Sequence, residues 1–278
     1  MEWNVVSALF YGALGGLFEF LPVSPELHQR LMLKLTGLAL PDSSISLAVH
    51  IGAFLAIVLA SYGKIGKLYR EHKIAALPSR HRKRQPDTVS LMEIRLLKIA
   101  AIPAVLSCFL AAFLHSYLNR SWLLIVLAVL NGILISLPQY MTRANKDTRS
   151  CSPLDAFLVG FSGVVGMLPG FSRFGVLYSV GTIRGMGRQY CLDFTYMLGI
   201  PWLIALCVID IGVMIFSGGA SFAGATFLQC IFACAAAFGA GFGGIRLMRF
   251  LVVKNDLGGF AYYNWGVAML AFIFYLIG

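Results

Sequence analysis

Charged residues are scarce in this chain, which excludes an ordinary soluble globular domain. Asp, Glu, Lys and Arg make up 12% of the 278 residues, whereas hydrophobic residues make up 59%. A soluble domain carries roughly 25% charged residues. Several apolar runs contain the roughly 20 residues that an α-helix needs to cross a bilayer. The composition therefore predicts an all-α, polytopic membrane protein.

Acidic residues are fewer than basic ones: 12 Asp and Glu stand against 22 Lys and Arg, a net charge of +10. Such an excess can indicate nucleic-acid binding. In a membrane protein it is explained more simply by Lys and Arg gathered in the cytoplasmic connections. We therefore expect no nucleic-acid partner.

CxxC spacings are absent, so the chain lacks the usual signature of a zinc or thiol redox motif. Most of its six cysteines lie in apolar stretches, and only Cys230 and Cys234 share a helix face. We expect them to be small buried hydrophobic residues. A metal or redox role for this pair is the alternative.

Prolines interrupt two apolar segments. Residues 3–21 predict a helix that ends at Pro22, and Ser24 predicts the N-cap of a second helix that continues to about residue 38. Residues 154–168 predict a helix that ends at Pro169 and Gly170, followed by a short helix. We expect two re-entrant helix pairs, because irregular backbone at membrane depth must line a cavity or be buried in protein.

Six longer apolar segments predict full spans, at about 44–62, 92–114, 122–137, 192–216, 226–247 and 260–277. The basic stretch from Lys64 to Arg84 predicts a solvated cytoplasmic loop. With this loop inside, the inner connections contain sixteen Lys and Arg, and the outer ones contain Arg120 alone. This asymmetry follows the positive-inside rule and places both ends of the chain outside.

Four positions of the first half recur 147 residues later. They are Gly16, Leu21, Pro22 and Gly52, which match Gly163, Leu168, Pro169 and Gly199. Under the charge-derived topology the two broken segments enter from opposite sides. The sequence therefore predicts a single integral membrane domain of two inverted repeats, about 1–137 and 148–278, with both breaks near the midplane.

Polar residues gather at the first break. Glu19, Ser24, Glu26 and His28 all lie between positions 19 and 28, inside a strongly apolar stretch. An ionisable side chain at membrane depth is costly and is a functional-site hypothesis by default. Each residue also has a purely structural explanation: an ion pair for Glu19, an N-cap for Ser24, a helix-dipole partner for Glu26 and a hydrogen-bonded buried ring for His28.

At the second break, Gly170, Ser172 and Arg173 precede a short helix. Helix N-termini attract phosphate, and arginine adds a bidentate donor suited to it. Arg30 is expected at the outer rim, where it attracts the same ligand. The two breaks together suit a phosphate head group whose tail lies in lipid, although Arg173 could serve only to neutralise Glu19.

Two further polar residues lie inside predicted spans. For His50 we expect a packing role or a hydrogen bond to a neighbouring residue. Asp210 has no partner that the sequence identifies.

The segment Glu19–Ser24 with His28, and the segment Pro169–Arg173 with Gly175, resemble the two signature motifs of the undecaprenyl-diphosphate phosphatase family, the bacitracin-resistance type. Four other stretches extend the resemblance over nearly the whole chain: 50–56, 183–185, 199–201 and 260–263. The resemblance implies a membrane enzyme that removes the terminal phosphate of a C55 isoprenyl diphosphate. Such an enzyme recycles the carrier lipid for peptidoglycan synthesis.

On this resemblance, Glu19, His28 and Arg173 would be catalytic. The phosphate-binding residues would be Ser24, Glu26, Arg30, Gly170 and Ser172. The family implies a divalent cation, Mg²⁺ or Ca²⁺, which Glu19 would hold with Glu26 as a second ligand. It also implies the bacterial cytoplasmic membrane, an outward-facing pocket and a polyprenyl diphosphate partner, with a homodimer as an option.

Four positions depart from the family pattern, one of them His50, which stands where the family's third helix usually has glutamine. Gly15 stands where an acidic or amide residue is usual, and Pro25 and Phe174 each replace a hydroxyl-bearing residue. Glu26 could return the lost carboxylate to the pocket. The departures leave a second hypothesis open, in which the chain is a lipid-phosphate transporter or flippase of the same fold with a non-hydrolytic site.

Overall fold

The structure, a computed structural model of the chain, contains helices joined by short connections and no strand in the residues that it describes. These are all residues except 1–2, 119, 142–143, 217–223, 255–256 and 278. Within the described part, six helices are long and apolar enough to cross a membrane. The predicted all-α, polytopic architecture is therefore confirmed.

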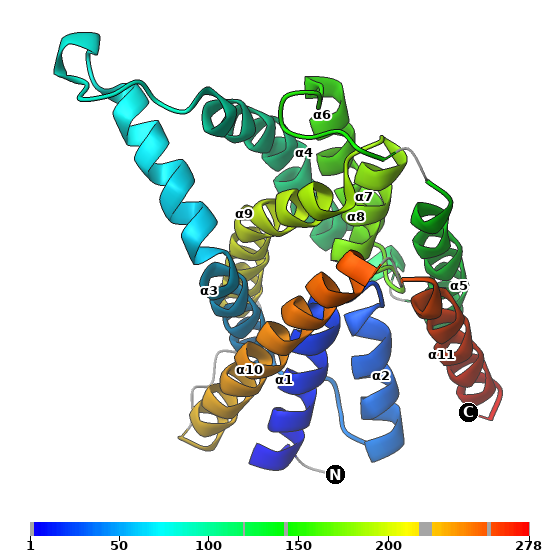
Figure 1. The fold of residues 1–278 in the computed structure, drawn as a ribbon. Helices are drawn as coiled ribbons and strands as arrows, with labels where there is room; N and C mark the ends of the chain where they lie inside the picture. The colour runs from blue at the N-terminus through cyan, green and yellow to red at the C-terminus, as the bar shows by residue number, and fades with distance from the viewer. Residues whose placement is uncertain (1–2, 119, 142–143, 217–223, 255–256, 278) are drawn as a thin grey trace.

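The helices of both halves are shown in Figure 1. The first half contains α1 (Val5–Phe20), α2 (Pro25–Thr36), α3 (Ser43–Ala76), α4 (Thr88–Leu118) and α5 (Ser121–Ser136). Two 3₁₀ turns follow α3 and α5, namely η1 (Ser79–His81) and η2 (Leu137–Tyr140). The second half contains α6 (Pro153–Phe161), α7 (Gly163–Gly166), α8 (Arg173–Ile183), α9 (Arg188–Phe216), α10 (Gly224–Lys254) and α11 (Gly258–Ile277).

The first break has the capping chemistry that the sequence predicts. α1 ends before Pro22, because proline has no N–H to continue the helix. Ser24 is the N-cap of α2, where its hydroxyl accepts a hydrogen bond from the backbone N–H of Leu27 at 3.2 Å, and Pro25 takes the first helical position. α2 ends at Gly37, which has φ +65°.

The second break depends on a glycine that no other residue could replace. Gly170 has φ +93°, and a Cβ atom there would collide with the backbone of Leu124 and Ala128 in α5. Ser172 then caps α8, and its hydroxyl accepts from the N–H of Gly175 at 3.0 Å. The break is therefore held tightly against a neighbouring helix.

The two broken segments approach each other from opposite ends of the molecule. In Figure 1, α1 and α2 enter from the lower end, whereas α6 and α8 enter from the upper end. α1 packs along α10 and α6 packs along α4, while α3 pairs with α9 and α5 with α11. If α1 is matched with α6, α3 with α9, α4 with α10 and α5 with α11, each of these contacts has its counterpart in the other half. An inverted repeat produces such a pattern.

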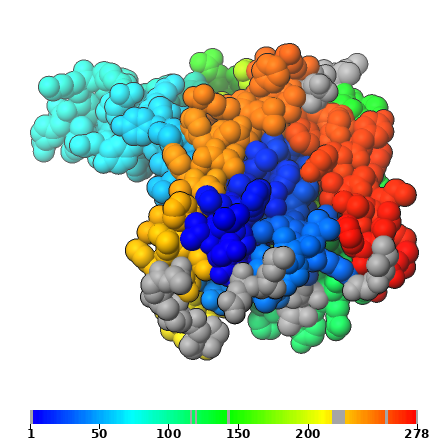
Figure 2. Space-filling view, turned by 90° about the horizontal axis from the view of Figure 1, so that it is seen from below, coloured from blue at the N-terminus to red at the C-terminus, as the bar shows by residue number. Residues whose placement is uncertain are grey.

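Glycines allow α1 to lie directly on α10. A Cβ atom at Gly12 or Gly16 would collide with the backbone of Ala233 or Ala237. Such close approach of two helix backbones is typical of small-residue interfaces in membranes. Figure 2 shows α1 enclosed between α10 and α2 at the lower end of the molecule.

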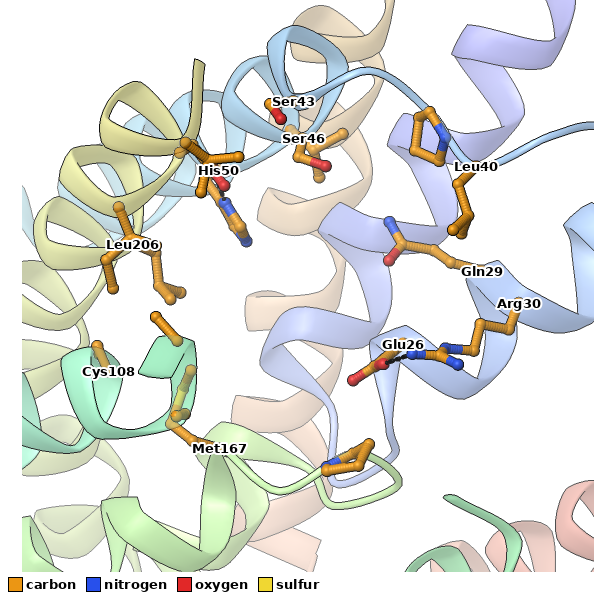
Figure 3. A pocket seen from close by; sticks show the side chains of 18 of the residues that line it. Glu26, Gln29, Arg30, Leu40, Ser43, Ser46, His50, Cys108, Met167 and Leu206 are labelled. Carbon is orange, nitrogen blue, oxygen red and sulfur yellow. Dashed lines mark hydrogen bonds and ion pairs between the residues drawn. The ribbon is translucent and has the colours of Figure 1, made fainter. Parts of the chain in front are cut away.

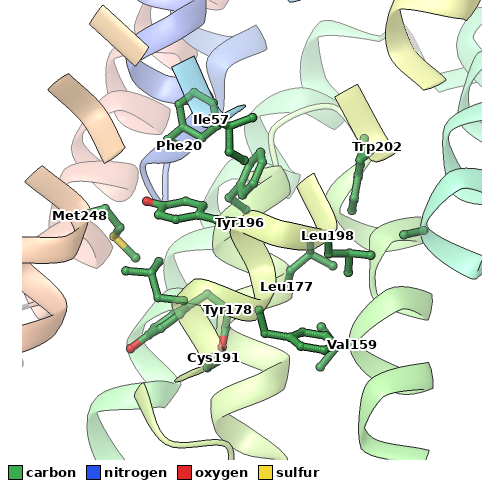
Figure 4. Packing of buried hydrophobic residues seen from close by; sticks show 14 of the residues in the cluster. Phe20, Ile57, Val159, Leu177, Tyr178, Cys191, Tyr196, Leu198, Trp202 and Met248 are labelled. Carbon is green, nitrogen blue, oxygen red and sulfur yellow. Dashed lines mark hydrogen bonds between the residues drawn. The ribbon is translucent and has the colours of Figure 1, made fainter. Parts of the chain in front are cut away.

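Aromatic residues fill the centre of the fold beside the two breaks (Figure 4). The Phe174 ring lies 5.0 Å from that of Phe20 and 5.7 Å from that of Tyr196, and all three rings are buried. A Cβ atom at Gly199 would collide with the Phe174 ring. The family departure at Phe174 therefore fills the hydrophobic core and does not face a ligand.

The expected loop after Tyr62 was wrong in its first part, because α3 continues as helix to Ala76. Figure 1 shows this extension projecting from the helix bundle. No proline occurs between Tyr62 and Pro78. Ion pairs hold the extension to the chain that follows: Lys64 to Glu93 at 2.5 Å and Glu71 to Arg84 at 2.5 Å. Basic side chains alone do not end a helix, since Lys and Arg are good helix formers.

The end of this projection is tied back by Asp87. Its carboxylate accepts hydrogen bonds from the Ser90 hydroxyl and from the backbone N–H of Val89, and it pairs with Lys67. These contacts, the Ser90 hydrogen bond above all, hold the pKa of Asp87 below its usual range. The projection is therefore an ordered, basic extension of α3.

Candidate active site

A cavity of about 460 Å³ extends from the α2–α3 connection to the second break. Its lining includes Leu40 and Pro41 from the α2–α3 connection, Leu118 at the end of α4, and Pro169 and Arg173 from the second break. The side walls come from α1, α2, α3, α4 and α9 (Figure 3). A space of this size can hold a small phosphate head group.

The ion pair that the sequence suggested between the two breaks is present. A guanidinium nitrogen of Arg173 donates to Glu19 Oε2 at 2.6 Å. Glu19 is buried, with 3% of its surface exposed, and its Oε1 has no hydrogen-bond partner in the described residues. Arg173 lines the cavity. The pair therefore places a cation at the cavity wall, with a carboxylate oxygen of unused capacity behind it.

One face of α2 supplies polar groups to the cavity. Glu26, Gln29, Arg30 and Leu33 all line it, as expected for residues three or four positions apart on a helix. Glu26 and Arg30 form an ion pair (Figure 3). Both predicted residues thus face the cavity, and their side chains remain partly exposed, Glu26 at 34% and Arg30 at 27%.

Gln29 is a cavity residue that the sequence analysis missed. A Cβ atom at Gly15 would collide with its side-chain amide, so that amide occupies the space beside Gly15. The missing side chain at Gly15 is therefore replaced by an amide from the neighbouring helix. The helical spacing from Glu26 to Gln29 was the signal that could have found it.

His28 does not line the cavity. Its Nδ1 lies 2.6 Å from the backbone oxygen of Ser24, and its Nε2 lies 2.8 Å from the hydroxyl of Tyr263. The ring stacks on Phe18 at a centroid distance of 3.9 Å. His28 therefore contacts α1 and α11, and the cavity lining that contains Arg173 does not include it.

Three other predicted residues have structural partners instead of facing the cavity. Ser24 is buried and caps α2. Ser172 is buried, and its hydroxyl donates to the backbone oxygen of Leu21 at 2.7 Å while capping α8. Gly170 packs against α5. These residues fix the backbone of the two breaks. Their effect on a ligand is therefore indirect, through the shape of the breaks.

Two asparagines that the sequence analysis did not single out hold the breaks together. The side chain of Asn131 in α5 accepts from the backbone N–H of Ser172 at 3.0 Å, and Asn264 in α11 donates to the backbone oxygen of Pro22 at 2.9 Å. The two amides also bond each other at 2.9 Å. Both asparagines are buried, so they satisfy backbone groups that the breaks leave unpaired.

His50 and Asp210 meet across the cavity wall. His50 Nδ1 lies 2.6 Å from Asp210 Oδ2. The His50 side chain is 16% exposed and the Asp210 side chain 15%. The pair joins α3 to α9, and both residues line the cavity. The structure thus identifies the partner that Asp210 lacked in the sequence, and His50 makes the expected hydrogen bond.

Cysteines do not form a metal or redox centre in the described residues. Cys230, Cys234 and the other four are free thiols, and Cys108, Cys151 and Cys191 are buried. No group of three or more His, Cys, Asp or Glu side chains there is arranged to hold a metal ion by itself. Any cation at this site would therefore need ligands from a bound molecule.

The cavity as a whole is built to bind an anion. Two guanidinium groups, on Arg30 and Arg173, face one space from opposite repeats. Each has a carboxylate partner that offsets its charge in the absence of a ligand. Arginine in such a partly dry site favours phosphate, which it can contact through two parallel hydrogen bonds.

Comparison with known proteins agrees with this chemistry. The family model described as bacitracin resistance protein BacA matches residues 8–270. A protein named undecaprenyl-diphosphatase from Carboxydothermus hydrogenoformans is 28% identical over 96% of this chain and 97% of its own. One named undecaprenyl-diphosphatase 1 from Shouchella clausii is 25% identical over 98% of this chain and 96% of its own. An undecaprenyl-diphosphatase from Methanococcus maripaludis is 24% identical over 96% of this chain and 98% of its own.

Proposed function

Because this chain belongs to the bacitracin resistance protein BacA family, we propose that it is an undecaprenyl-diphosphatase of the membrane. The reaction is hydrolysis of a polyprenyl diphosphate to the monophosphate and inorganic phosphate. Relatives that carry this name match nearly the whole chain. The activity accounts for a cation-lined cavity inside an otherwise apolar bundle.

The observation that carries the proposal is the Arg173–Glu19 pair at the meeting point of the two breaks. Arg173 holds the terminal phosphate and stabilises the charge that develops on its oxygens as the phosphorus–oxygen bond breaks. Glu19 fixes the guanidinium and keeps the site neutral before substrate binds. Both charges are pre-positioned, so little reorganisation accompanies the reaction.

Arg30 and Glu26 serve the second phosphate. They line the same cavity as Arg173, and they form an ion pair that a diphosphate can open. A phosphate that approaches Arg30 displaces Glu26, whose carboxylate then becomes available to a cation. Arg30 therefore contributes chiefly to substrate affinity, and Arg173 to the chemical step.

A divalent cation, Mg²⁺ or Ca²⁺, fits this donor set only together with the substrate. Glu19 Oε1 is buried and unpartnered behind Arg173, and Glu26 is a carboxylate that lines the cavity itself. Mg²⁺ is commonly held by one or two carboxylates and by phosphate oxygens. We assign Glu19 and Glu26 as its protein ligands. When bound, the cation would neutralise charge on the diphosphate.

The cavity opens on the outer side of the bacterial cytoplasmic membrane in this proposal. Three of its lining residues, Leu40, Pro41 and Leu118, lie in or next to connections that carry almost no Lys or Arg. The basic connections lie on the opposite side, which the positive-inside rule assigns to the cytoplasm. The lipid tail of the substrate would remain in the bilayer beside the helices.

The experiment is phosphate release from undecaprenyl diphosphate by the purified protein in detergent. We expect turnover by the wild type and a loss of at least roughly 100-fold in kcat/KM for Arg173→Ala and for Glu19→Ala. Arg70→Ala, on the exposed extension of α3, is the matched control and keeps full activity. A wild-type protein that binds the lipid phosphate without turnover would instead support the transporter hypothesis, which no feature of the structure favours.

A further inference from the structure

The proposed phosphate site leaves open which group activates the attacking water. Hydrolysis needs a base within hydrogen-bond distance of that water. Glu19 and Glu26, the carboxylates nearest the phosphates, are each engaged by a guanidinium. In the proposed site Glu19 stays paired with Arg173, and Glu26, once released from Arg30, is assigned to the cation. A positive partner lowers the basicity of a carboxylate, so a group elsewhere on the cavity wall is better suited to act as the base.

His28 is unsuited to this task in the structure. Both of its ring nitrogens have partners, the backbone oxygen of Ser24 and the hydroxyl of Tyr263. The ring also stacks between Phe18 and Tyr263 and does not line the cavity. His28 therefore has no free ring nitrogen directed at the cavity in the described residues.

His50 has the features that His28 lacks. It is the histidine that lines the cavity among the described residues, and its ring projects into that space (Figure 3). Its Nδ1 is held by Asp210 at 2.6 Å, whereas Nε2 has no hydrogen-bond partner in the described part of the chain. A carboxylate on Nδ1 places the hydrogen there and leaves the lone pair on Nε2 directed at the cavity.

The position of this pair is set by two helix faces. Ser43, Ser46 and His50 follow one another at helical spacing along α3, and all three line the cavity. Leu206, Asp210 and Val213 do the same along α9. Since α3 and α9 pack together, the two faces close on the same wall, and the pair is a built part of the cavity.

We propose that His50, oriented by Asp210, is the general base for the hydrolysis. Nε2 takes a proton from water as the water oxygen bonds to the terminal phosphorus. The bond from that phosphorus to the bridging oxygen breaks, and the lipid monophosphate leaves with the electron pair. The imidazolium, stabilised by Asp210, then returns its proton to the released phosphate. This inference rests on the proposed function, and Asp210 is a positioning residue.

The first test is His50→Gln, which keeps a polar side chain of similar reach but is a poor base. We expect kcat for phosphate release to fall by roughly 100-fold or more with KM within threefold of wild type. His72→Gln, on the exposed extension of the same helix, is the matched control and stays at the wild-type rate. His50→Gln with kcat within threefold of wild type would overturn the assignment.

Chemical rescue separates a base from a structural residue. In His50→Ala, added imidazole should restore at least a tenth of the lost rate and leave the wild type unchanged. The cavity that the substitution enlarges has room for the free ring. Failure of imidazole to raise the rate of a His50→Ala protein that elutes as a single peak and unfolds like the wild type would count against the proposal.

Asp210→Asn tests the positioning role. In Asp210→Asn, kcat should fall and KM should stay near the wild-type value. The double variant His50→Gln/Asp210→Asn should be no slower than His50→Gln alone, because the two residues act as one unit. Losses that multiply would show independent roles and contradict the pairing.

If the wild type itself lacks turnover, the proposed function fails. If the wild type turns over while these variants stay active, only the base assignment fails.

Discussion

Single residues at the two breaks show how a charge is kept stable inside an apolar bundle. Glu19 and Arg173 come from opposite halves of the chain and neutralise each other at 2.6 Å. Removing one partner of a buried pair leaves an uncompensated charge, which costs more than removing both. The pair therefore makes a structural contribution that is separable from catalysis.

We expect Glu19→Gln to destabilise the protein by about 3 kcal/mol, because Arg173 then keeps its charge without a partner. The double variant Glu19→Gln/Arg173→Gln should be more stable than Glu19→Gln. Unfolding midpoints in one detergent measure both. A double variant that is less stable than the single one would show that the pair is not what stabilises Arg173.

The two histidines at the cavity and beside it should respond differently to substitution. His28→Gln loses a stacked ring and the hydrogen bond to Tyr263. We expect it to lower the unfolding midpoint and to reduce kcat by less than His50→Gln does. Steady-state rates of the two variants, measured beside the wild type, give the comparison. A larger kcat loss for His28→Gln would place the chemistry on the α11 side of α2.

What the sequence could predict at this scale follows from helical geometry. Glu19 and Arg173 were paired correctly, because each is an isolated charge beside a proline break. His28 was grouped with Glu26 by closeness in sequence. Two residues along a helix turn the side chain by roughly 200°, so His28 faces away from Glu26 and Arg30. The partner of Asp210, 160 residues away in α3, depends on how α3 meets α9 and has no local signal.

Among the elements, α1 and α10 depend on the absence of side chains at their contact. Gly16→Leu places a side chain against the backbone of Ala237, which cannot move aside without separating the helices. Overpacking of this kind costs roughly 1–3 kcal/mol or more. We expect a clearly lower unfolding midpoint and reduced yield in the membrane fraction.

Gly239→Ala, on α10, is the control for this substitution. A Cβ atom at Gly239 would meet nothing within 4 Å. Replacing an open helical glycine by alanine stabilises by roughly 0.4–1 kcal/mol. An equal loss of stability in both variants would contradict the close contact of α1 with α10.

Helix α6 is fixed at its start by a buried carboxylate. Asp155 accepts from Lys146 at 2.8 Å and from Arg184 at 2.8 Å, and it also accepts from the backbone N–H of Ser152 in a capping box. We expect Asp155→Asn to destabilise by about 3 kcal/mol, because two cations then lose their partner. Thermal unfolding measures the loss. Leu154→Asn, next to it but exposed, should change stability far less.

Element boundaries were predictable wherever proline, glycine or a capping serine marks them. Pro22, Ser24, Gly37 and Ser172 are boundary residues in the structure as the sequence indicates. The helix beyond Tyr62 was not foreseen, because its basic residues suggested a loop. That segment is stabilised by tertiary ion pairs with Glu93 and Arg84, which no local pattern reveals.

For the molecule as a whole, the proposed orientation can be tested directly. Leu40 lines the cavity and is 71% exposed, and Lys83 is exposed in the α3–α4 connection. In intact cells a membrane-impermeant maleimide should label Leu40→Cys. Lys83→Cys should be labelled only after permeabilisation. The unsubstituted protein is the control for its own thiols, and the reverse pattern would place the cavity on the cytoplasmic side.

Removal of divalent cations tests the proposed cation site. With a chelator, phosphate release should fall at least roughly tenfold and recover when Mg²⁺ is restored. Mn²⁺ binding in the presence of inorganic pyrophosphate, followed by electron paramagnetic resonance, should weaken in Glu19→Gln. Full activity in the chelator, together with unchanged Mn²⁺ binding in the variant, would remove the cation from the proposal.

The hydrogen bonds that the first break receives from the second half of the chain have a consequence for biogenesis. The backbone at Leu21 and Pro22 gains its partners from Ser172 and Asn264, which the ribosome makes long after α1 and α2 have entered the bilayer. The first hairpin to be inserted is thus among the last parts to reach its final state. A nascent chain that stops before α11 would hold this hairpin open, exposed to membrane proteases until synthesis is complete.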